Sequence, residues 1–254
     1  MTKPAKIDAI YRYPVKGLSP QPMDRVTLAP GATLPADRLY AIENGPSGYD
    51  PAAPKFIPKQ RFLVLMRNER LATLRTHYDE ASHTLVINQE GREATRGDLR
   101  TSEGRVAIET FFEKFMPDEL GGPPKVLFGD QHSFSDVGAK VVSIINLASV
   151  AAVETAAGAP VDPLRFRANV YVSGWPAWHE FDLMDQMLTI GGTKLKIVKR
   201  TVRCAATNLD PVTGIRDLTI PKTLQQNFQH ADCGVYAEVV TGGDIATGDT
   251  ITAN

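Results

Sequence analysis

The sequence predicts a mainly β protein with a few helices, an α+β chain built from two strand-rich units. Short segments rich in Val, Ile, Thr and aromatic residues recur along all 254 residues, and turn residues bound each of them. The 20 glycines and 18 prolines make up about 15% of the chain, slightly above the usual share of about 12%. Only a few segments show helical spacing of apolar residues. This composition favours many short strands joined by tight turns.

The first hundred residues are expected to form a β-barrel-like unit. Its strands are predicted at residues 7–13, 25–28, 39–43, 71–77 and 84–88. Between the third and fourth of these strands, residues 44–59 contain six glycines and prolines and little periodicity. This segment is therefore predicted to be a long exposed loop.

A helix is predicted at residues 101–115, where apolar side chains recur near helical spacing. Pro117 and the glycine and proline run that follows it stop this helix. We take the helix and the proline-rich segment 117–124 as the junction between an N-terminal domain at residues 1–100 and a second domain at residues 101–254.

The second domain is expected to be another partly closed β-barrel. Helices are predicted in the Ala-rich run LASVAAVETAA, which Gly158 ends, and at residues 221–228. Strands are predicted at residues 125–128, 141–145, 165–173, 187–190, 193–202, 205–209, 235–240 and 250–252.

Composition excludes several classes of function. No apolar stretch is long enough to cross a membrane, and no secretory signal is recognisable, so the expected compartment is the cytoplasm. A net charge of −1 predicts no global attraction to nucleic acid, so any basic site must be local. Two cysteines are too few for a disulfide scaffold or a four-cysteine cluster. The five histidines lack the spacing of a catalytic zinc site, and no nucleotide-binding or serine-hydrolase motif occurs.

The segment LRFRANVYV at residues 164–172 is the most informative predicted strand. Alternation would place Arg165, Arg167, Asn169 and Tyr171 on one face and apolar residues on the other. A cationic face of this kind is either a solvated surface or the wall of a groove that grips an anion, because guanidinium groups match phosphate.

Cys204 ends the basic stretch KLKIVKRTVRC, in which five Lys and Arg residues precede it within ten positions. Nearby cations favour a thiolate, which is both a nucleophile and a soft metal ligand. The structural alternative is a buried, inert cysteine. The sequence NLDPVTG that follows describes a turn, which places Cys204 near a strand end or loop.

Other chemically suggestive residues receive structural interpretations. Cys233 precedes a clear strand and is expected to be a small buried residue. Trp175, Trp178 and His179 could form a stacking lip over a ligand, but they are expected to anchor a loop. Asp210 is a conceivable proton relay, but an Asp before a proline is expected to form a turn.

Several of these segments together resemble the molybdenum cofactor sulfurase C-terminal (MOSC) family. FRANVYV and LTIGGTKLKIVKRTVRCAATNLDPVTG, with its single cysteine, resemble the MOSC domain itself, and VYAEVVTGGDIATGDTI resembles its last strands. YRYPVKGLSP and LPADRLYAI resemble the β-barrel domain that precedes MOSC in the amidoxime-reducing family. The resemblance covers nearly the whole chain.

This resemblance implies a molybdenum cofactor, a molybdopterin held between the two domains, and no dependence on pyridoxal phosphate. Cys204 matches the thiolate ligand of the metal. The residues that match the family's cofactor contacts are Lys16, Arg38, Arg167, Asn169 and Arg203, with Ser149 and Thr201 as further candidates. The sequence departs from the family pattern at Gly17, where serine is common, at Ala168, where proline is common, and at Thr201, where serine or cysteine is common.

The leading functional hypothesis is a molybdenum-dependent oxidoreductase that reduces N-hydroxylated compounds, with electrons from a separate electron-transfer protein. The balanced net charge and the lack of a long apolar stretch predict no nucleic-acid or membrane partner. One alternative is a carrier that holds the cofactor, or sulfur on Cys204, without substrate turnover. Another is a metal-free hydrolase or transferase that depends on Cys204 as a nucleophile.

Overall fold

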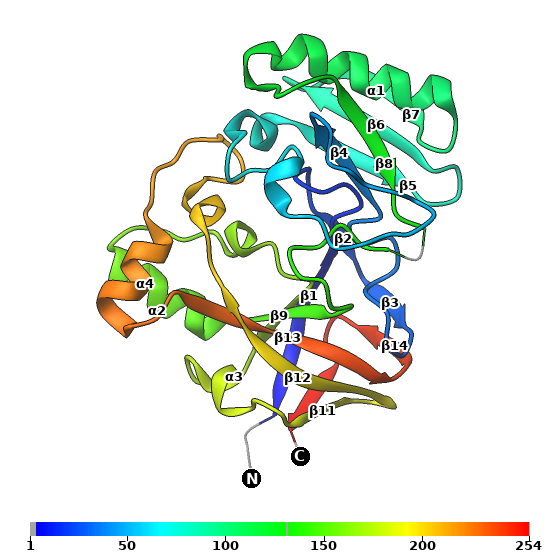
Figure 1. Ribbon diagram of the computed structural model, residues 1–254. Coiled ribbons are helices and arrows are strands. Elements are labelled where there is room, and N and C mark those ends of the chain that lie inside the picture. The colour runs from blue at the N-terminus through cyan, green and yellow to red at the C-terminus, as the bar shows by residue number, and fades with distance from the viewer. Residues whose placement is uncertain (1–3, 131, 254) are drawn as a thin grey trace.

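The computed structural model describes residues 4–130 and 132–253, and it consists of two strand-rich units stacked on one another (Figure 1). The lower unit in this view is a barrel, and the upper unit carries the longest helix on its outer side. The predicted fold class, mainly β with a few helices, is confirmed. None of the helices in the described residues is both long and apolar enough to span a bilayer.

Seven strands close the barrel. β1 (Ala5–Arg12) pairs with β15 on one side and with β10 on the other, which joins the two ends of the sheet. In order around the barrel the remaining strands are β10 (Val170–Ser173), β9 (Val142–Asn146), β13 (Asp232–Thr241), β12 (Thr193–Val202), β11 (Met187–Ile190) and β15 (Thr250–Ala253). β2 (Gln21–Met23) extends the sheet beyond β1. Closure leaves few unpaired strand edges.

Alternation along the barrel strands produces the core. In β12, Leu195 and Ile197 are fully buried, whereas Lys194, which points to the other face of the strand, is exposed. Together with Ile7, Val172 and other inward-facing residues they form one apolar cluster inside the barrel. The helices α2 (Leu147–Ala157), α3 (His179–Asp182) and α4 (Ile220–Phe228) lie on the outside of the barrel, on the left in Figure 1.

The upper unit is built from two small sheets and one helix. β4 (Tyr40–Asn44) pairs with β8 (Pro124–Phe128), and β5 (Arg75–Asp79), β6 (Thr84–Gln89) and β7 (Arg92–Asp98) form the other sheet. Thr101 caps the N-terminus of α1 (Ser102–Phe115), because its side chain accepts a hydrogen bond from the Gly104 N–H. The buried faces of these elements form a second apolar core.

Hydrogen bonding between strands crosses the predicted domain boundary at residue 101. β1 comes from the first predicted domain and closes the barrel of the second, whereas β8 comes from the second and pairs with β4 of the first. β3 (Arg25–Leu28) likewise pairs with β14 (Gly243–Ala246). Each unit therefore contains a strand from the other predicted domain. The domain limits 1–100 and 101–254 stay a prediction.

The predicted strand at residues 165–173 is wrong in its first half. Residues Pro163–Phe166 form a short 3₁₀ helix, η4, and β10 begins only at Val170. Asp162 caps η4 by accepting a hydrogen bond from the Leu164 N–H, and Pro163 has the φ angle that the first helical position needs. Simple alternation therefore does not decide which way Arg165 and Arg167 point.

Two other predicted strands are corrected. Residues 205–209 contain the 3₁₀ helix η5 (Ala205–Asn208), because Thr207 bonds back to the Cys204 carbonyl through both its N–H and its hydroxyl. Residues 71–77 are split between η2 (Glu69–Thr73) and β5. β7 was not predicted, because most of its side chains are exposed and only pairing with β6 defines it. The long loop at 44–59 is confirmed up to η1 (Lys59–Arg61).

Candidate functional site

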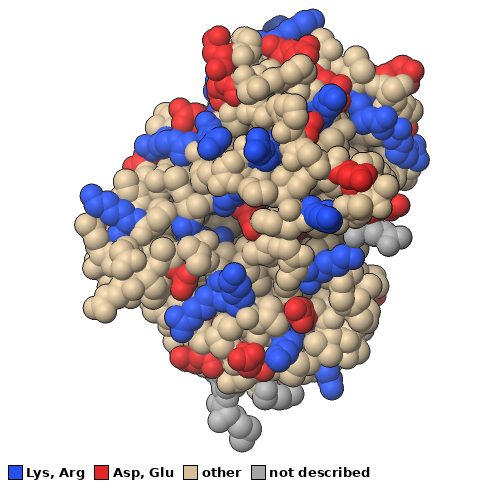
Figure 2. All heavy atoms as spheres, viewed as in Figure 1, with Lys and Arg blue, Asp and Glu red and all other residues tan. Residues whose placement is uncertain are grey.

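A cleft of about 330 Å³ lies between the two units. Eight Lys and Arg side chains line it against two Asp side chains, although the whole chain has a net charge of −1. Figure 2 shows basic and acidic groups interspersed over this face and a hollow near its middle with basic atoms beside it. The basic residues of the cleft are Lys16, Arg38, Lys59, Arg165, Arg167, Lys199, Arg200 and Arg203. The structure thus concentrates positive charge in this cleft, in keeping with the expectation that any basic site is local.

Two arginines of the cleft contact the ring of Tyr13. The guanidinium carbons of Arg38 and Arg167 each lie 4.3 Å from the ring centroid, within cation–π range. Both arginines have left-handed backbones, with φ of 52° for Arg38 and 50° for Arg167. Non-glycine residues rarely adopt this conformation, and it concentrates at functional sites because surrounding structure must enforce it.

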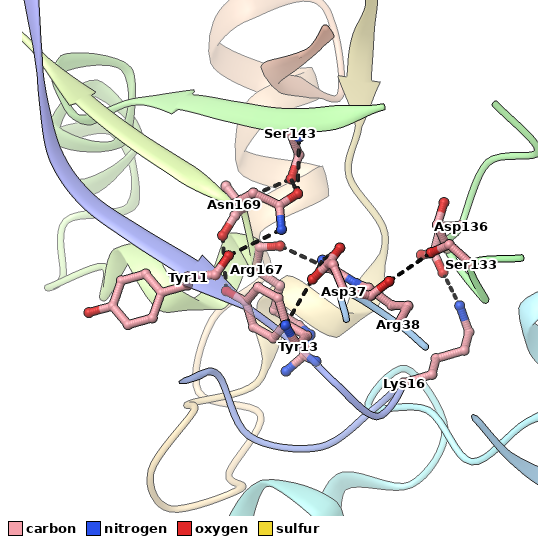
Figure 3. A network of polar contacts seen from close by, with 12 residues as sticks. Tyr11, Tyr13, Lys16, Asp37, Arg38, Ser133, Asp136, Ser143, Arg167 and Asn169 are labelled. Carbon is pink, nitrogen blue, oxygen red and sulfur yellow. Dashed lines mark hydrogen bonds and ion pairs between the residues drawn. The ribbon is translucent and has the colours of Figure 1, made fainter. Parts of the chain in front are cut away.

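Arg38 has charged and polar partners, whereas Arg167 does not. Arg38 binds the Asp37 carboxylate at 2.7 Å and donates to the Arg167 carbonyl at 3.0 Å (Figure 3). Among the described residues, no carboxylate or carbonyl accepts a hydrogen bond from the Arg167 guanidinium. Burial, together with the like charge of Arg38, lowers the pKa of Arg167 to about 10, so the group stays cationic at neutral pH. A half-buried cation without an acceptor is suited to binding an anion.

Lys16 reaches the cleft from a sharp turn. Its Nζ donates to the Phe134 carbonyl at 2.8 Å and to Asp136 at 2.6 Å (Figure 3). Burial lowers the pKa of Lys16, and Asp136 offsets only part of this effect. Gly17 follows with φ of 83°, and a Cβ there would lie 2.6 Å from the Leu63 carbonyl oxygen. The glycine that departs from the family pattern is therefore required by this backbone.

Cys204 lies half-exposed in the cleft, two residues after the end of β12. Its Sγ is 3.4 Å from the Nζ of Lys59, which also binds Asp136 at 2.9 Å. The carboxylate of Asp136 and the sulfur of Cys204 raise the pKa of Lys59, and their effect exceeds that of burial, which lowers it. An ammonium group thus stands next to the sulfur and donates a hydrogen bond to it. The expectation that Cys204 lies near a strand end in a basic environment is met.

Two further residues of the cleft have buried polar atoms without a partner in the described part of the chain. Arg203 uses Nε to bind the Cys233 carbonyl at 2.7 Å and Nη1 to bind the Phe166 carbonyl at 2.8 Å, but its Nη2 has no partner. The Thr201 hydroxyl also has none. Buried polar atoms left unpaired are destabilising, so these two donors indicate a place for acceptor oxygens of a ligand.

Asn169 lines the cleft but mainly holds the scaffold together. Its Oδ1 accepts hydrogen bonds from the N–H and the hydroxyl of Ser143, and its Nδ2 donates to the Tyr11 carbonyl at 3.1 Å (Figure 3). These bonds connect β9 with β1 beside Arg167. One N–H of the amide remains available to a ligand.

Ser149 is the one predicted cofactor contact that the structure does not bring to the cleft. It is fully buried in α2, where its hydroxyl donates to Glu180 at 2.9 Å and accepts from the Trp178 N–H at 2.8 Å. Burial raises the pKa of the Glu180 carboxyl. Ser149 lies away from the cleft because α2 runs along the outside of the barrel, and it is therefore not a candidate cofactor contact.

Replacing Ser149 with alanine should lower the free energy of unfolding by about 1–2 kcal/mol, because Glu180 and the Trp178 N–H each lose a buried partner. Chemical denaturation measures this loss. Thr155→Ala is the matched control, since Thr155 is exposed on the same helix. A Ser149→Ala protein that keeps its stability but loses bound cofactor would restore Ser149 to the site.

The remaining suggestive residues have structural roles. Asp210 accepts hydrogen bonds from the N–H groups of Val212 and Thr213, which forms the expected turn. Cys233 is fully buried, and burial raises the pKa of its thiol to about 12. Trp175 is buried against the barrel core, and Trp178 stacks on residues of the outer helices. No cluster of three metal-ligating side chains occurs within residues 4–130 and 132–253.

Sequence reasoning missed Lys59, Asp136 and Tyr13. Lys59 ends the segment predicted to be only a loop, and Asp136 lies in another irregular segment with no motif. Tyr13 belongs to the motif YRYPVKG, whose aromatic residues could have indicated a partner for the arginines. The sequence holds no signal for Lys59 and Asp136, because the residues that meet here are far apart along the chain. Lys59 and Cys204 are separated by 145 positions.

Removing the charge of Asp136 should test its link to Lys16 and Lys59. These two cations hold the pKa of Asp136 well below its usual range, although burial opposes them. The side chain is 45% exposed, so we expect Asp136→Asn to lose about 1 kcal/mol of stability at pH 7. The depressed pKa stabilises the fold only above the unfolded value of about 3.9. Denaturation curves of the two proteins should therefore converge as the pH falls below that value, and a constant difference would contradict this assignment.

Comparison with known proteins identifies the family. The MOSC domain matches residues 123–252, and the MOSC N-terminal beta barrel domain matches residues 4–116. The chain therefore belongs to the MOSC family, as the sequence resemblance implied, and the cleft lies between its two domains. This family is associated with the molybdenum cofactor.

The chain is similar to curated proteins with a named activity. "Mitochondrial amidoxime reducing component 2" of Bos taurus is 30% identical over 122 residues, covering 43% of this chain and 36% of that protein. "Mitochondrial amidoxime-reducing component 1" of Homo sapiens is 28% identical over 134 residues, covering 48% and 39%. The matched regions thus span well under half the length of these relatives.

Two solved structures share lower similarity. The YUAD protein from Bacillus subtilis superposes with a TM-score of 0.44 at 13% identity, covering 98% of this chain and 95% of that one. YiiM from Geobacillus stearothermophilus gives a TM-score of 0.35 at 18% identity, covering 44% and 53%.

Proposed function

We propose that this protein binds the molybdenum cofactor in the cationic cleft and reduces N-hydroxylated compounds there, with electrons from a separate electron-transfer protein. The observation that carries the proposal is the position of Arg167, a half-buried guanidinium without an acceptor among the described residues, in the same cleft as the half-exposed thiol of Cys204. The named activity of the amidoxime-reducing relatives supports the choice of substrate class.

The donor groups of the cleft fit an anionic metallopterin. Arg167 and the unpaired Nη2 of Arg203 would bind anionic oxygens, and the Thr201 hydroxyl would donate a further hydrogen bond. Arg38 and Lys16 would add positive charge, although both already have carboxylate partners. Asn169 would position Arg167 by fixing the neighbouring strands.

Cys204 would supply the thiolate ligand, since sulfur is a ligand that soft metal centres prefer. Lys59 would orient the sulfur from the opposite domain by donating a hydrogen bond to it. When bound, the cofactor supplies the two-electron chemistry, in which two electrons and two protons convert N–OH into N–H and water. The protein would contribute binding, orientation and a cationic environment.

The half-exposed thiol also fits a second candidate, a carrier that holds the cofactor or a sulfur atom on Cys204 without turnover. One experiment separates the two. The protein is expressed in a host that makes the cofactor, its molybdenum content is measured, and benzamidoxime is supplied with a chemical reductant. Bound molybdenum and formation of benzamidine are expected.

Full molybdenum occupancy without turnover would favour the carrier. Absence of molybdenum from the wild-type protein would overturn the proposal. Hydrolysis or group transfer that depends on Cys204 and survives removal of the metal would instead favour the metal-free hydrolase or transferase.

A further inference from the structure

A second cavity of about 230 Å³ adjoins the cationic cleft and differs from it in chemistry. Five residues line both spaces: Gly17, Leu65, Arg165, Arg167 and Ala206. Beyond this shared wall, apolar side chains dominate, among them Leu18, Leu71, Leu74, Leu164, Leu209 and Val212. An apolar chamber therefore opens beside the unpaired guanidinium of Arg167.

Of the three charged residues in the wall of this cavity, Arg75 and Arg165 are already paired within the protein, and only Arg167, on the wall shared with the cleft, has no acceptor for its guanidinium among the described residues. Arg75 donates to the carbonyls of Ala72 at 2.7 Å, Leu74 at 3.0 Å and Val212 at 3.1 Å. The terminal nitrogens of Arg165 bind Asp217 at 2.8 Å each. The cavity thus offers apolar contact rather than charge, which is the character of a site for the hydrophobic part of a small molecule.

Bonds between the two units hold the cavity open in a fixed shape. Arg216 donates to the carbonyls of Leu65 at 3.1 Å and Met66 at 3.0 Å, so the loop after η5 is tied to the upper unit. Gly214 in this loop has φ of 73°, and a Cβ there would lie 3.1 Å from the Glu69 carbonyl oxygen. A cavity at a domain interface with both walls anchored is preformed for a ligand.

We infer that this apolar cavity binds the hydrocarbon body of the substrate, an aromatic ring or a group of similar size, while the N–OH end extends past Arg167 into the cleft. This inference rests on the proposed function. A cavity of about 150 Å³ lined by aliphatic and aromatic side chains is known to hold benzene, so 230 Å³ accommodates a substituted ring. Ala206 lies two residues after Cys204, which keeps their Cα atoms within about 7 Å. A ring in the cavity therefore leaves the N–OH group within reach of the thiol.

The test fills the cavity from two opposite walls. Val212→Trp acts from the barrel unit and Ala72→Leu from the upper unit. Ile215→Trp is the matched control, because Ile215 is in the same loop, is 61% exposed against 59% for Val212, and does not line the cavity. Binding of benzamidoxime and of acetamidoxime is measured by calorimetry on the molybdenum-loaded proteins without reductant, and turnover of both is then measured with reductant.

We expect each filling variant to weaken benzamidoxime binding and to lower its kcat/KM on the order of tenfold, as for the loss of about two buried CH₂ groups. Acetamidoxime binding, molybdenum content and thermal unfolding should stay near wild type, and Ile215→Trp should behave like wild type. The inference is overturned if molybdenum content falls in both filling variants, because the cavity then belongs to the cofactor. It is also overturned if both substrates weaken equally or if neither changes.

The two proposals fail in different ways. If Val212→Trp weakens benzamidoxime binding but no protein reduces benzamidoxime, the apolar subsite is retained and the proposed reaction is overturned. Benzamidoxime that is reduced equally well by wild type and both filling variants would retain the reaction and overturn the subsite.

Discussion

Replacing Cys204 with serine should remove molybdenum from the protein and lower benzamidoxime turnover at least ~100-fold, the loss expected when a soft ligand becomes a hydroxyl. The side chain is half-exposed at the end of β12, and its Sγ contacts only the ammonium of Lys59 among the described polar groups. Serine is nearly isosteric there, so the fold should remain intact. Elemental analysis and circular dichroism of the two proteins measure both effects.

Cys233→Ser is the matched control, because the chain has two free cysteines in opposite environments. Cys233 is fully buried in the apolar cluster beneath α2 and α4. A serine hydroxyl buried there should lower the free energy of unfolding by about 1–3 kcal/mol while the molybdenum content stays unchanged. A Cys204→Ser protein that still holds molybdenum would remove the thiolate from the proposed site.

Arg167→Ala should weaken cofactor binding by roughly 100-fold, equivalent to about 3 kcal/mol for the loss of a charged hydrogen-bonding group. The cofactor-free protein should barely change in stability. Removing a half-buried charge beside the like charge of Arg38 stabilises the fold, and losing the contact with the Tyr13 ring offsets this gain by about 1 kcal/mol. Cofactor content after gel filtration and thermal unfolding of the cofactor-free protein measure the two quantities.

Arg165→Ala provides the contrast two residues away. Arg165 is 4% exposed, and both terminal nitrogens bind the Asp217 carboxylate. Breaking this pair should lower the free energy of unfolding by about 1.5–3 kcal/mol, less than for a fully buried pair because the Asp217 side chain is 42% exposed. If Arg167→Ala destabilises the cofactor-free protein as much as Arg165→Ala does, Arg167 is a structural residue and its assignment to the cofactor is wrong.

The elements with strong local patterns were predictable. Alternation in residues 193–202 predicted β12 at its observed limits, and the spacing of phenylalanines predicted α1 to within one residue. The turn after Cys204 followed from Asp210 and Pro211, whose geometry is local. The same reasoning failed at residues 165–173, where the cap of Asp162 and the ion pair of Arg165 with Asp217 override alternation.

By itself, the sequence determined the fold class, the family motifs and a thiol that follows a basic strand, because these properties depend on neighbours within a few residues. The tertiary structure alone decided that β1 closes the barrel, that Lys59 meets Cys204, and that Ser149 lies away from the cleft. It also decided which arginine has no hydrogen-bond acceptor for its guanidinium among the described residues, Arg167 rather than Arg38 or Arg165. The physical reason is that hydrogen bonds and charge pairs form between side chains that folding brings together, and no local pattern records which pairs will meet.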